Sequence, residues 1–319
     1  MATISLRASK RLRLSPPVCR FVQPRCAFTT SRGLAEQQRA EDKTQQQRQH
    51  EKTTHFGFET IDESQKESKV AGVFSSVASS YDTMNDLMSL GIHRLWKDHF
   101  VRGLNPGGHT PGAPQQGWHI LDIAGGSGDI AFRMLDHATN INHDRNTHVT
   151  ISDINPDMLA EGRKRAAQSP YARTGRLDFI EANAENLHMI PDDSIDLYTV
   201  SFGIRNFTHK DMALREAYRV LKPGGVFACL EFSKVRNPLF DFVYKRWSFA
   251  AIPLIGQVVA GDRDSYQYLV ESIDRFPSQT EWRDMIKDAG FLIPGAQDGK
   301  GWEDLTDGIA AVHKGVKPA

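Results

Sequence analysis

From residue 118 onward, short apolar runs alternate with segments in which apolar residues recur at helical spacing. The apolar runs predict strands at 118–123, 148–152, 177–181, 195–201 and 226–232. The periodic segments predict helices at 128–138, 156–167 and 210–221, and the last of these ends at Lys-Pro-Gly-Gly. Strands that alternate with helices indicate an α/β fold, with a mostly parallel sheet and helices on both faces.

The segments on either side of this core follow other patterns. Apolar residues at helical spacing predict an amino-terminal helical cap over 67–104, and the composition of 105–117 predicts a surface loop. After the core, 234–288 is predicted to be mostly helical and interrupts the alternation. We expect 291–296 and 307–313 to form an antiparallel hairpin at the edge of the sheet.

The amino-terminal residues differ in charge. Residues 1–35 contain seven basic residues and no acidic one, with Ser, Thr and Leu between them, which predicts a mitochondrial transit peptide and a place in the matrix. Residues 36–66 are rich in Gln, Glu, Lys and Arg with little periodicity, so we expect a disordered linker or a frayed helix there. One folded domain is then expected over 67–319.

The rest of the chain excludes several classes of protein. After residue 35 there are 32 basic and 39 acidic residues, a net charge of −7, which argues against a nucleic-acid substrate. Cys229 is the one cysteine of that part, so we expect neither a disulfide framework nor a cysteine metal site. No apolar run reaches the roughly 18 residues that a membrane span needs; the longest apolar-rich stretch, 247–261, contains Pro, Gly and Gln.

The strongest candidate for chemistry is the stretch Leu-Asp-Ile-Ala-Gly-Gly-Ser-Gly-Asp at 121–129, taken together with Asp153. It is a strand, a glycine loop, a helix and a second strand that ends on an acid. Glycine lets the backbone approach a ligand closely, and a carboxylate at the next strand end can bind a ribose diol. The pattern therefore predicts a site for a cofactor that contains a nucleoside.

Two cofactors fit these glycines. Gly126, Gly128 and Ala131 match the dinucleotide fingerprint, whereas Asp122 followed by small residues resembles motif I of class I S-adenosylmethionine methyltransferases. Asp122 and Asp129 flank the loop, and no Lys or Arg lies between 118 and 132. Acids repel a pyrophosphate and attract a sulfonium, so the charges favour S-adenosylmethionine over NAD.

Ligands of such sheets bind beyond the carboxyl ends of the strands. The expected donor-binding residues follow those ends and are Asp122, Gly126, Ser127, Gly128, Asp153, Asn183, Ala184 and Ser201. Among them we expect Asn183 and Ala184 to meet the adenine, and Ser201 to lie beneath the sulfonium. Arg205 and Asn206 come just after a strand and face the acceptor side.

Two longer stretches, 81–96 and 219–233, closely resemble the signatures of the ubiquinone/menaquinone C-methyltransferase family, as do Ser-Phe-Gly-Ile-Arg-Asn and Gly-Gly-Ser-Gly-Asp. The resemblance covers about 68–314 and, given the transit peptide, points to a mitochondrial member. Ala124 replaces the first glycine of the general motif I, a departure that the family shares. The loop at 105–117 is long and we expect a surface insertion without catalytic role.

The resemblance implies a class I methyltransferase fold and a reaction. A ring carbon of 2-polyprenyl-6-methoxy-1,4-benzoquinol receives a methyl group from S-adenosylmethionine, and no metal is needed. It also implies contact with the inner membrane from the matrix side, membership of a complex of ubiquinone-biosynthesis proteins and, as an open alternative, a homodimer. Two alternatives stay open for 247–261. The segment forms a buried helix, or it lines a tunnel for the polyprenyl tail or contacts the membrane surface.

The expected catalytic residues are Arg205, Tyr81 and Asn206. Arginine is a poor base because it stays protonated, so we expect Arg205 to stabilise a phenolate, through a water that carries the proton away. Tyr81 or Asn85 would orient a quinol hydroxyl. His93 is a second choice for acid–base work and is more often structural.

Three other functions stay open at this stage. The acceptor could be a different lipid or small molecule on the same fold. The chain could bind quinones without catalysis and hold a biosynthetic assembly together. An NAD-dependent oxidoreductase is the third, and it predicts nicotinamide binding, which we expect to be absent.

Overall fold

The computed structural model describes residues 53–77, 85–86, 89, 91–108, 117–260, 262–295 and 300–319. The predicted transit peptide, most of the predicted linker and the candidate Tyr81 lie outside the described residues. Most of the predicted surface loop, at 109–116, does as well.

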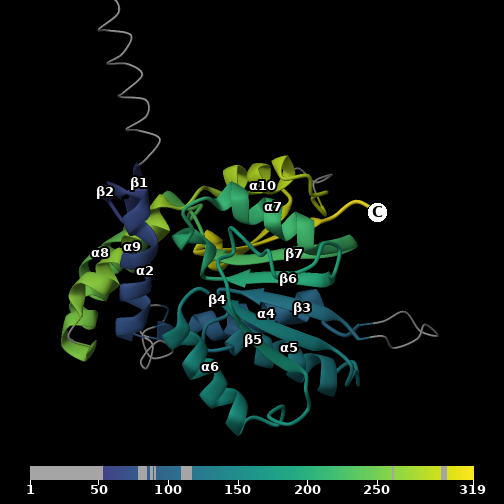
Figure 1. The fold of residues 1–319 in the computed structure, drawn as a ribbon. Coiled ribbons are helices and arrows are strands. Elements are labelled where there is room, and N and C mark those ends of the chain that lie inside the picture. Colours follow the sequence, from purple (N-terminus) through teal and green to yellow (C-terminus); the bar gives the residue numbers. More distant parts are fainter. Residues whose placement is uncertain are drawn as a thin grey trace, which may run out of the picture. The chain divides into compact units, whose positions relative to one another are not determined.

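A seven-stranded sheet forms the centre of the described part (Figure 1). Its strands are β3 (His119–Ile123), β4 (His148–Asp153), β5 (Leu177–Glu181), β6 (Ile195–Ser201), β7 (Leu221–Phe232), β8 (Trp302–Leu305) and β9 (Ala310–Val316). They follow the order β5-β4-β3-β6-β7-β9-β8, parallel from β5 to β7 and antiparallel at β9 and β8. The predicted α/β fold with an antiparallel edge is confirmed.

Helices cover both faces of the sheet. Three of them connect parallel strands, namely α5 (Asp129–Asn140), α6 (Pro156–Gln168) and α7 (Lys210–Val220), while α4 (Ile92–Leu104) precedes β3 and α10 (Gln279–Asp288) precedes β8. Within each strand successive side chains point to opposite faces. In β6, Leu197 packs in the core that α4 and α5 cover, whereas Tyr198 packs in the core that α7 and α10 cover. The bounds of the core strands and helices therefore agree with the predicted ones to within a few residues, with the exception of the start of β7.

The Lys-Pro-Gly-Gly stretch, which was expected to be a turn between a helix and a strand, lies within strand β7. The helix ends before it, at Val220, as predicted, but β7 already begins at Leu221. The extra residues are absorbed by a register shift opposite Ile195, and Gly224 has a φ of 78° there. Glycine adopts this conformation without strain, so the strand continues through a stretch whose composition is typical of a turn.

The edge hairpin forms with a different first strand. β9 pairs with β8 at 302–305 and not with 291–296, where Leu292 makes only an isolated bridge to Val316. Leu292 is exposed, whereas β8 closes on β9 through a short 3-10 turn at Thr306–Gly308. A short connection favours pairing of adjacent segments, and this outweighs the apolar residues that predicted a strand at 291–296.

The predicted linker is corrected over 53–66. These residues form β1 (Thr53–Phe56), β2 (Glu59–Asp62) and the start of α2 (Glu63–Val77). Ile61 is buried, and the ring of Phe56 stacks on Tyr268 with 4.2 Å between centroids. Two apolar anchors thus fold a segment whose composition is mostly polar.

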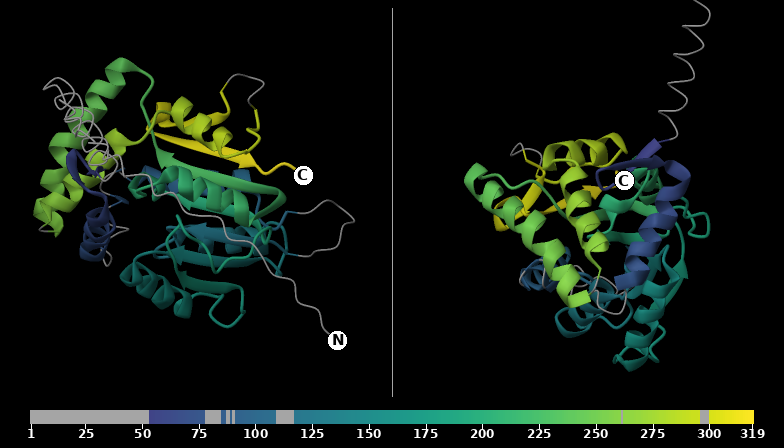
Figure 2. Two further views of the ribbon diagram at one scale, coloured as in Figure 1. Left: turned by 45° about the horizontal axis from the view of Figure 1, so that its top comes forward. Right: turned by 90° about the vertical axis from the view of Figure 1, so that its left-hand side faces the viewer.

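The region at 234–288 is helical as predicted. It contains α8 (Pro238–Ala260), α9 (Arg263–Arg275) and α10. In Figures 1 and 2, α8 runs beside α9, and both lie with α2 beyond one end of the sheet. None of the helices among the described residues has the length and apolar character required to cross a membrane.

Candidate functional site

A cleft opens at the carboxyl ends of β3 to β6, the edge where open α/β sheets bind ligands. Its volume is about 1110 Å³, including the part open to solvent. The predicted site residues that line it are Asp122, Gly126, Ser127, Asp153, Asn183, Ala184, Ser201 and Asn206. Gly128 and Arg205 do not line it; Gly128 precedes the first turn of α5.

The loop between β3 and α5 needs glycine for two reasons. Gly126 and Gly128 have φ values of 49° and 82°, in the left-handed region. A Cβ at Gly128 would lie 2.9 Å from the ring of Phe132, and one at Gly126 would lie 2.7 Å from Cε of Met158. The loop can therefore bring its backbone close to a ligand only without side chains at these positions.

Asp153 at the end of β4 holds this loop in place. Its Oδ2 accepts a hydrogen bond from the N–H of Gly126 at 3.0 Å, and its Oδ1 accepts one from the N–H of Asn155 at 2.9 Å. Burial raises the pKa of Asp153 to about 6, and the N–H donors oppose this rise. Each carboxylate oxygen has a second lone pair, so Asp153 can accept from a diol while it keeps the loop ordered.

Asp122 lies buried at the floor of the cleft. Its Oδ1 accepts a hydrogen bond from the hydroxyl of Thr199 at 2.7 Å, while its Oδ2 has no hydrogen-bond partner among the described residues. Burial raises the pKa of Asp122 to about 7. Ser201 Oγ, also in the lining, likewise has no partner there. Buried polar atoms without partners are costly, so these atoms mark where a polar ligand fits.

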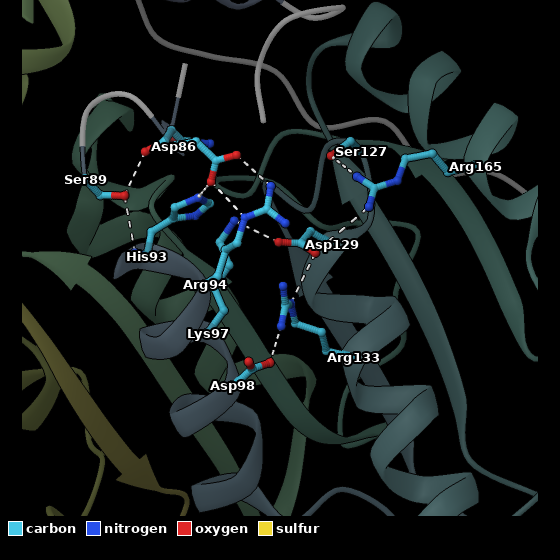
Figure 3. A network of polar contacts seen from close by, with 11 residues as sticks. Asp86, Ser89, His93, Arg94, Lys97, Asp98, Ser127, Asp129, Arg133 and Arg165 are labelled. Atoms are coloured by element: carbon cyan, nitrogen blue, oxygen red, sulfur yellow. Dashed lines mark hydrogen bonds and ion pairs between the residues drawn. The ribbon is translucent and has the colours of Figure 1, made fainter. Parts of the chain in front are cut away.

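Asp129, the second acid of the loop, lies in a network of cations (Figure 3). Lys97 Nζ lies 2.8 Å from its Oδ2, and Arg133 Nε and Arg165 Nη2 lie 3.1 and 4.0 Å from its Oδ1. Burial would raise the pKa of Asp129, but Lys97 and the two arginines outweigh burial and lower it to about 2. Asp129 is therefore ionised and compensated.

This network corrects the prediction, made from the sequence, that both acids beside the glycine loop repel an anion. The stretch 118–132 has no cation of its own, but the fold brings Lys97, Arg133 and Arg165 to it from three helices. Asp129 therefore does not repel an anion in the way that the linear sequence suggested. Asp122 and Asp153 have no ion-pair partner among the described residues, so of these three acids they retain the preference for a phosphate-free ligand.

Helix α2, which overlaps the predicted amino-terminal cap, supplies a wall of the cleft whose residues the sequence did not single out. Val70 and Phe74 line the cleft from this helix. Asn155 Nδ2 donates to the carbonyl of Ala71 at 3.0 Å, and Asn183 Nδ2 reaches the carboxylate of Glu67 at 3.4 Å. The helical spacing of Val70 and Phe74 is typical of packing, and nothing local distinguishes a cleft wall from a core contact.

Residues 62–317 match the model of the ubiE/COQ5 methyltransferase family. The chain belongs to this family. A Schizosaccharomyces pombe relative named 2-methoxy-6-polyprenyl-1,4-benzoquinol methylase, mitochondrial, is 58% identical and aligns over 83% of this chain and 84% of its own. A Brucella anthropi relative named ubiquinone/menaquinone biosynthesis C-methyltransferase UbiE is 52% identical over 82% of this chain and 92% of its own. A solved structure of a possible exported protein from Bordetella parapertussis agrees in fold, with a TM-score of 0.50 and 16% identity over 71% of this chain and 68% of that chain.

The cofactor of this ubiE/COQ5 methyltransferase is S-adenosylmethionine, and the cleft fits it. Asp153 would hold the ribose, and the unpartnered Oδ2 of Asp122 would meet positive charge. Asn183 and Ala184 line the cleft, as their predicted contact with adenine requires. Bound there, the cofactor supplies an electrophilic methyl group.

Of the two predicted catalytic residues that the structure describes, Asn206 lines the cleft. It belongs to the 3-10 turn η2 (Ile204–Asn206) and its Oδ1 accepts a hydrogen bond from the hydroxyl of Tyr268 at 2.9 Å. This bond orients the amide, and its Nδ2 has no partner among the described residues. Asn206 therefore offers a fixed N–H donor at the cleft.

Arg205 is directed elsewhere. Its guanidinium pairs with Glu231 at 3.0 Å and donates to Ser272 Oγ at 3.2 Å and to the carbonyl of Phe202. Burial raises the pKa of Glu231, and Arg205 opposes this rise. The predicted action of Arg205 on a phenolate stays a prediction, and it requires the guanidinium to exchange partners.

The three catalytic candidates from the predicted amino-terminal cap have different outcomes. Tyr81 lies outside the described residues. The backbone carbonyl of Asn85 accepts a hydrogen bond from the hydroxyl of Ser89 at 2.8 Å. His93 is buried against Asp86 at 2.9 Å and does not line the cleft, and burial lowers its pKa. The geometry favours the structural alternative for His93.

Proposed function

We propose that this chain is an S-adenosylmethionine-dependent C-methyltransferase of ubiquinone biosynthesis. Its acceptor is a 2-polyprenyl-6-methoxy-1,4-benzoquinol, and its product carries a new methyl group at ring carbon 3. The observation that carries this proposal is the cleft with its glycine loop, Asp122 and Asp153, in a chain 58% identical to a benzoquinol methylase.

The chemistry asks three things of the protein. A ring carbon becomes nucleophilic when a neighbouring hydroxyl loses its proton, so the resulting phenolate needs hydrogen-bond donors. The ring must lie in line with the methyl group, since positioning lowers the barrier of a bimolecular step. Water must be kept from the charged groups, and the wall of Val70 and Phe74 serves this purpose.

The side chains divide these tasks. Asn206 Nδ2 donates to a ring oxygen, and the hydroxyl of Tyr268 keeps the amide oriented. Arg205 stabilises the phenolate once its guanidinium turns from Glu231. Tyr81 orients the quinol hydroxyl from the amino-terminal cap.

The proposed location is the mitochondrial matrix, on the surface of the inner membrane. The basic, acid-free composition of 1–35 and the mitochondrial relative support the organelle. Helix α8 exposes apolar side chains that suit a lipid surface, namely Leu239, Phe242, Val243, Trp247 and Leu254. A complex with other ubiquinone-biosynthesis proteins and a homodimer are part of the proposal as well.

The test is a methyl-transfer assay with purified protein and a short-tailed 6-methoxybenzoquinol. We expect a ring-methylated product with this acceptor and no reaction with a phenol that lacks the second hydroxyl. A prenylated naphthoquinol as a third acceptor separates benzoquinol specificity from action on quinols in general. Transfer to the naphthoquinol alone would refute the proposed acceptor.

A further inference from the structure

A second cavity lies beside the donor cleft, at the carboxyl end of β7. Its volume is about 500 Å³, including the part open to solvent, and α8 and α9 contribute most of its lining. The apolar part of that lining includes Phe249 and Ile252 from α8 and Val270 and Ile273 from α9. Nothing assigned so far to the donor or to catalysis occupies this cavity.

A pair of phenylalanines separates the cavity from the donor cleft. Phe202 lines the cleft, Phe232 lines the cavity, and their ring centroids are 4.8 Å apart. Phe202 has a φ of 55°, a conformation that costs free energy for a residue with a Cβ and that is found at functional sites. The guanidinium of Arg205 lies 5.5 Å from the centroid of the Phe232 ring. Arg205, one of the proposed catalytic residues, therefore lies at this partition.

A buried hydroxyl points to a ligand in the cavity. Ser233, the residue after Phe232, lines the cavity and is 6% exposed. Its Oγ has no hydrogen-bond partner among the described residues. A buried polar atom of this kind needs a partner. An isoprenoid chain has no polar atom, so the partner would be an oxygen on the ring to which the chain is attached, next to Phe232.

Lys234, Asp241, Lys245 and Asp274 line the cavity beside its apolar residues, whereas the outer side of α8 is apolar. Helix α8 separates the cavity from a surface on which Leu239, Phe242 and Leu254 are each more than 60% exposed. Exposed apolar patches of this kind mark sites of contact with lipids or with other apolar partners. An apolar chain that leaves the cavity can therefore continue along α8 without entering water.

We propose that this second cavity binds the isoprenoid chain of the acceptor, while the ring passes Phe202 and Phe232 to reach the donor cleft. The inference rests on the proposed function, since it assigns the chain of the same quinol. It places the apolar chain between α8 and α9 and the polar ring beside Asn206. Acceptor affinity should therefore rise with the presence of a chain.

The test is photolabelling of the full chain with a farnesyl-methoxybenzoquinone that carries a diazirine at the far end of the farnesyl group. We expect label on peptides from 232–252 and 270–274, and we expect excess unlabelled prenylated quinone to remove it. Label confined to other peptides, or label that the competitor does not reduce, would overturn the proposal.

Substitutions make the test specific. Ile273→Trp fills the cavity from a partly exposed position, and we expect the labelling to fall about tenfold, as loss of buried apolar surface predicts. Ile141→Trp adds the same side chain at an exposed position at the end of α5, outside both the cleft and the cavity, and should label like the unmodified protein. If Ile273→Trp fails to bind S-adenosylmethionine in calorimetry, Ser233→Leu takes its place. Equal labelling of the filled and control variants would contradict the assignment.

This readout separates the two proposals. Labelling needs no turnover, so competed label in the cavity without any methyl transfer would refute the proposed function and retain the chain site. Methyl transfer with label elsewhere would refute the chain site alone.

Discussion

The guanidinium of Arg205 and the carboxylate of Glu231 form an ion pair of 3.0 Å, in which the side chains are 3% and 2% exposed. The pair joins the turn η2 to β7 and is reinforced by the bond from Arg205 to Ser272. A buried pair is weak evidence of net stability, but loss of one partner leaves an uncompensated charge.

Glu231→Gln should therefore destabilise the protein strongly. We expect the free energy of unfolding to fall by about 3 kcal/mol or more, because Arg205 stays charged and buried. Denaturant titration measures this. Arg215→Ala breaks an exposed pair with Asp211 on α7 and should change the free energy of unfolding by less than about 1 kcal/mol. Equal effects of the two substitutions would contradict this view of the buried pair.

Gly128→Ala should also be destabilising. A Cβ there meets the ring of Phe132 at 2.9 Å, and φ is 82°. We expect a loss of about 1–3 kcal/mol in the free energy of unfolding, together with weaker donor binding. Gly72→Ala is the matched control, since a Cβ in the middle of α2 meets nothing within 4 Å and should stabilise by up to about 1 kcal/mol. A stabilising Gly128→Ala would refute the strained-loop account.

Asp153→Ala should abolish most donor binding and leave the fold intact. The substitution removes two charge-assisted acceptors for the ribose, so we expect S-adenosylmethionine affinity to fall about a hundredfold. Calorimetry measures the affinity and circular dichroism checks the fold. Asp157→Asn, an exposed acid in the first turn of α6, should bind the donor normally. Unchanged methyl transfer by Asp153→Ala would rule out the ribose role.

Asp122 predicts a pH dependence of stability. Its pKa is raised by burial to about 7, so between about pH 4 and pH 7 the folded state holds a proton that the unfolded state releases. The contribution of this group to stability therefore falls as the pH rises through that window. Asp122→Asn should remove this slope, and denaturant titrations at several pH values measure it. Parallel pH profiles of the two proteins would contradict the raised pKa.

The same carboxyl predicts the opposite trend for donor binding. Its ionised form attracts a cationic ligand, so S-adenosylmethionine affinity should rise between about pH 6 and pH 8. In Asp122→Asn we expect weaker binding and no such rise. Calorimetric titrations across this range decide the point, and an identical rise in the variant would assign it to another group.

The sequence was sufficient for the parts of the fold that depend on local pattern. The core strands and helices follow from runs such as the one that ends at Asp122. The rule that strand ends converge led to most of the residues that line the cleft. The edge strand β8 was missed because hydropathy does not distinguish the segment around the exposed Leu292 from the partly buried strand β8. Pairing there is decided by a short turn and not by hydropathy.

The electrostatics of the site could not be read in the same way. Asp129 is neutralised by Lys97, which lies 32 residues earlier in the chain, and Arg205 is paired with Glu231, 26 residues later. Such ion pairs depend on how the helices and turns pack on the sheet, and the spacing of residues along the chain does not predict this packing. For Arg205 the sequence revealed the residue but not its buried partner.

The most direct test of the proposed reaction uses S-adenosylmethionine labelled with ¹³C in its methyl group and a prenylated 6-methoxybenzoquinol as acceptor. We predict that NMR of the product shows the label in a methyl group bonded to ring carbon 3, and that Asp153→Ala yields almost none. A label found in a methoxy group, or no transfer by a protein that binds the donor, would contradict C-methylation at this site.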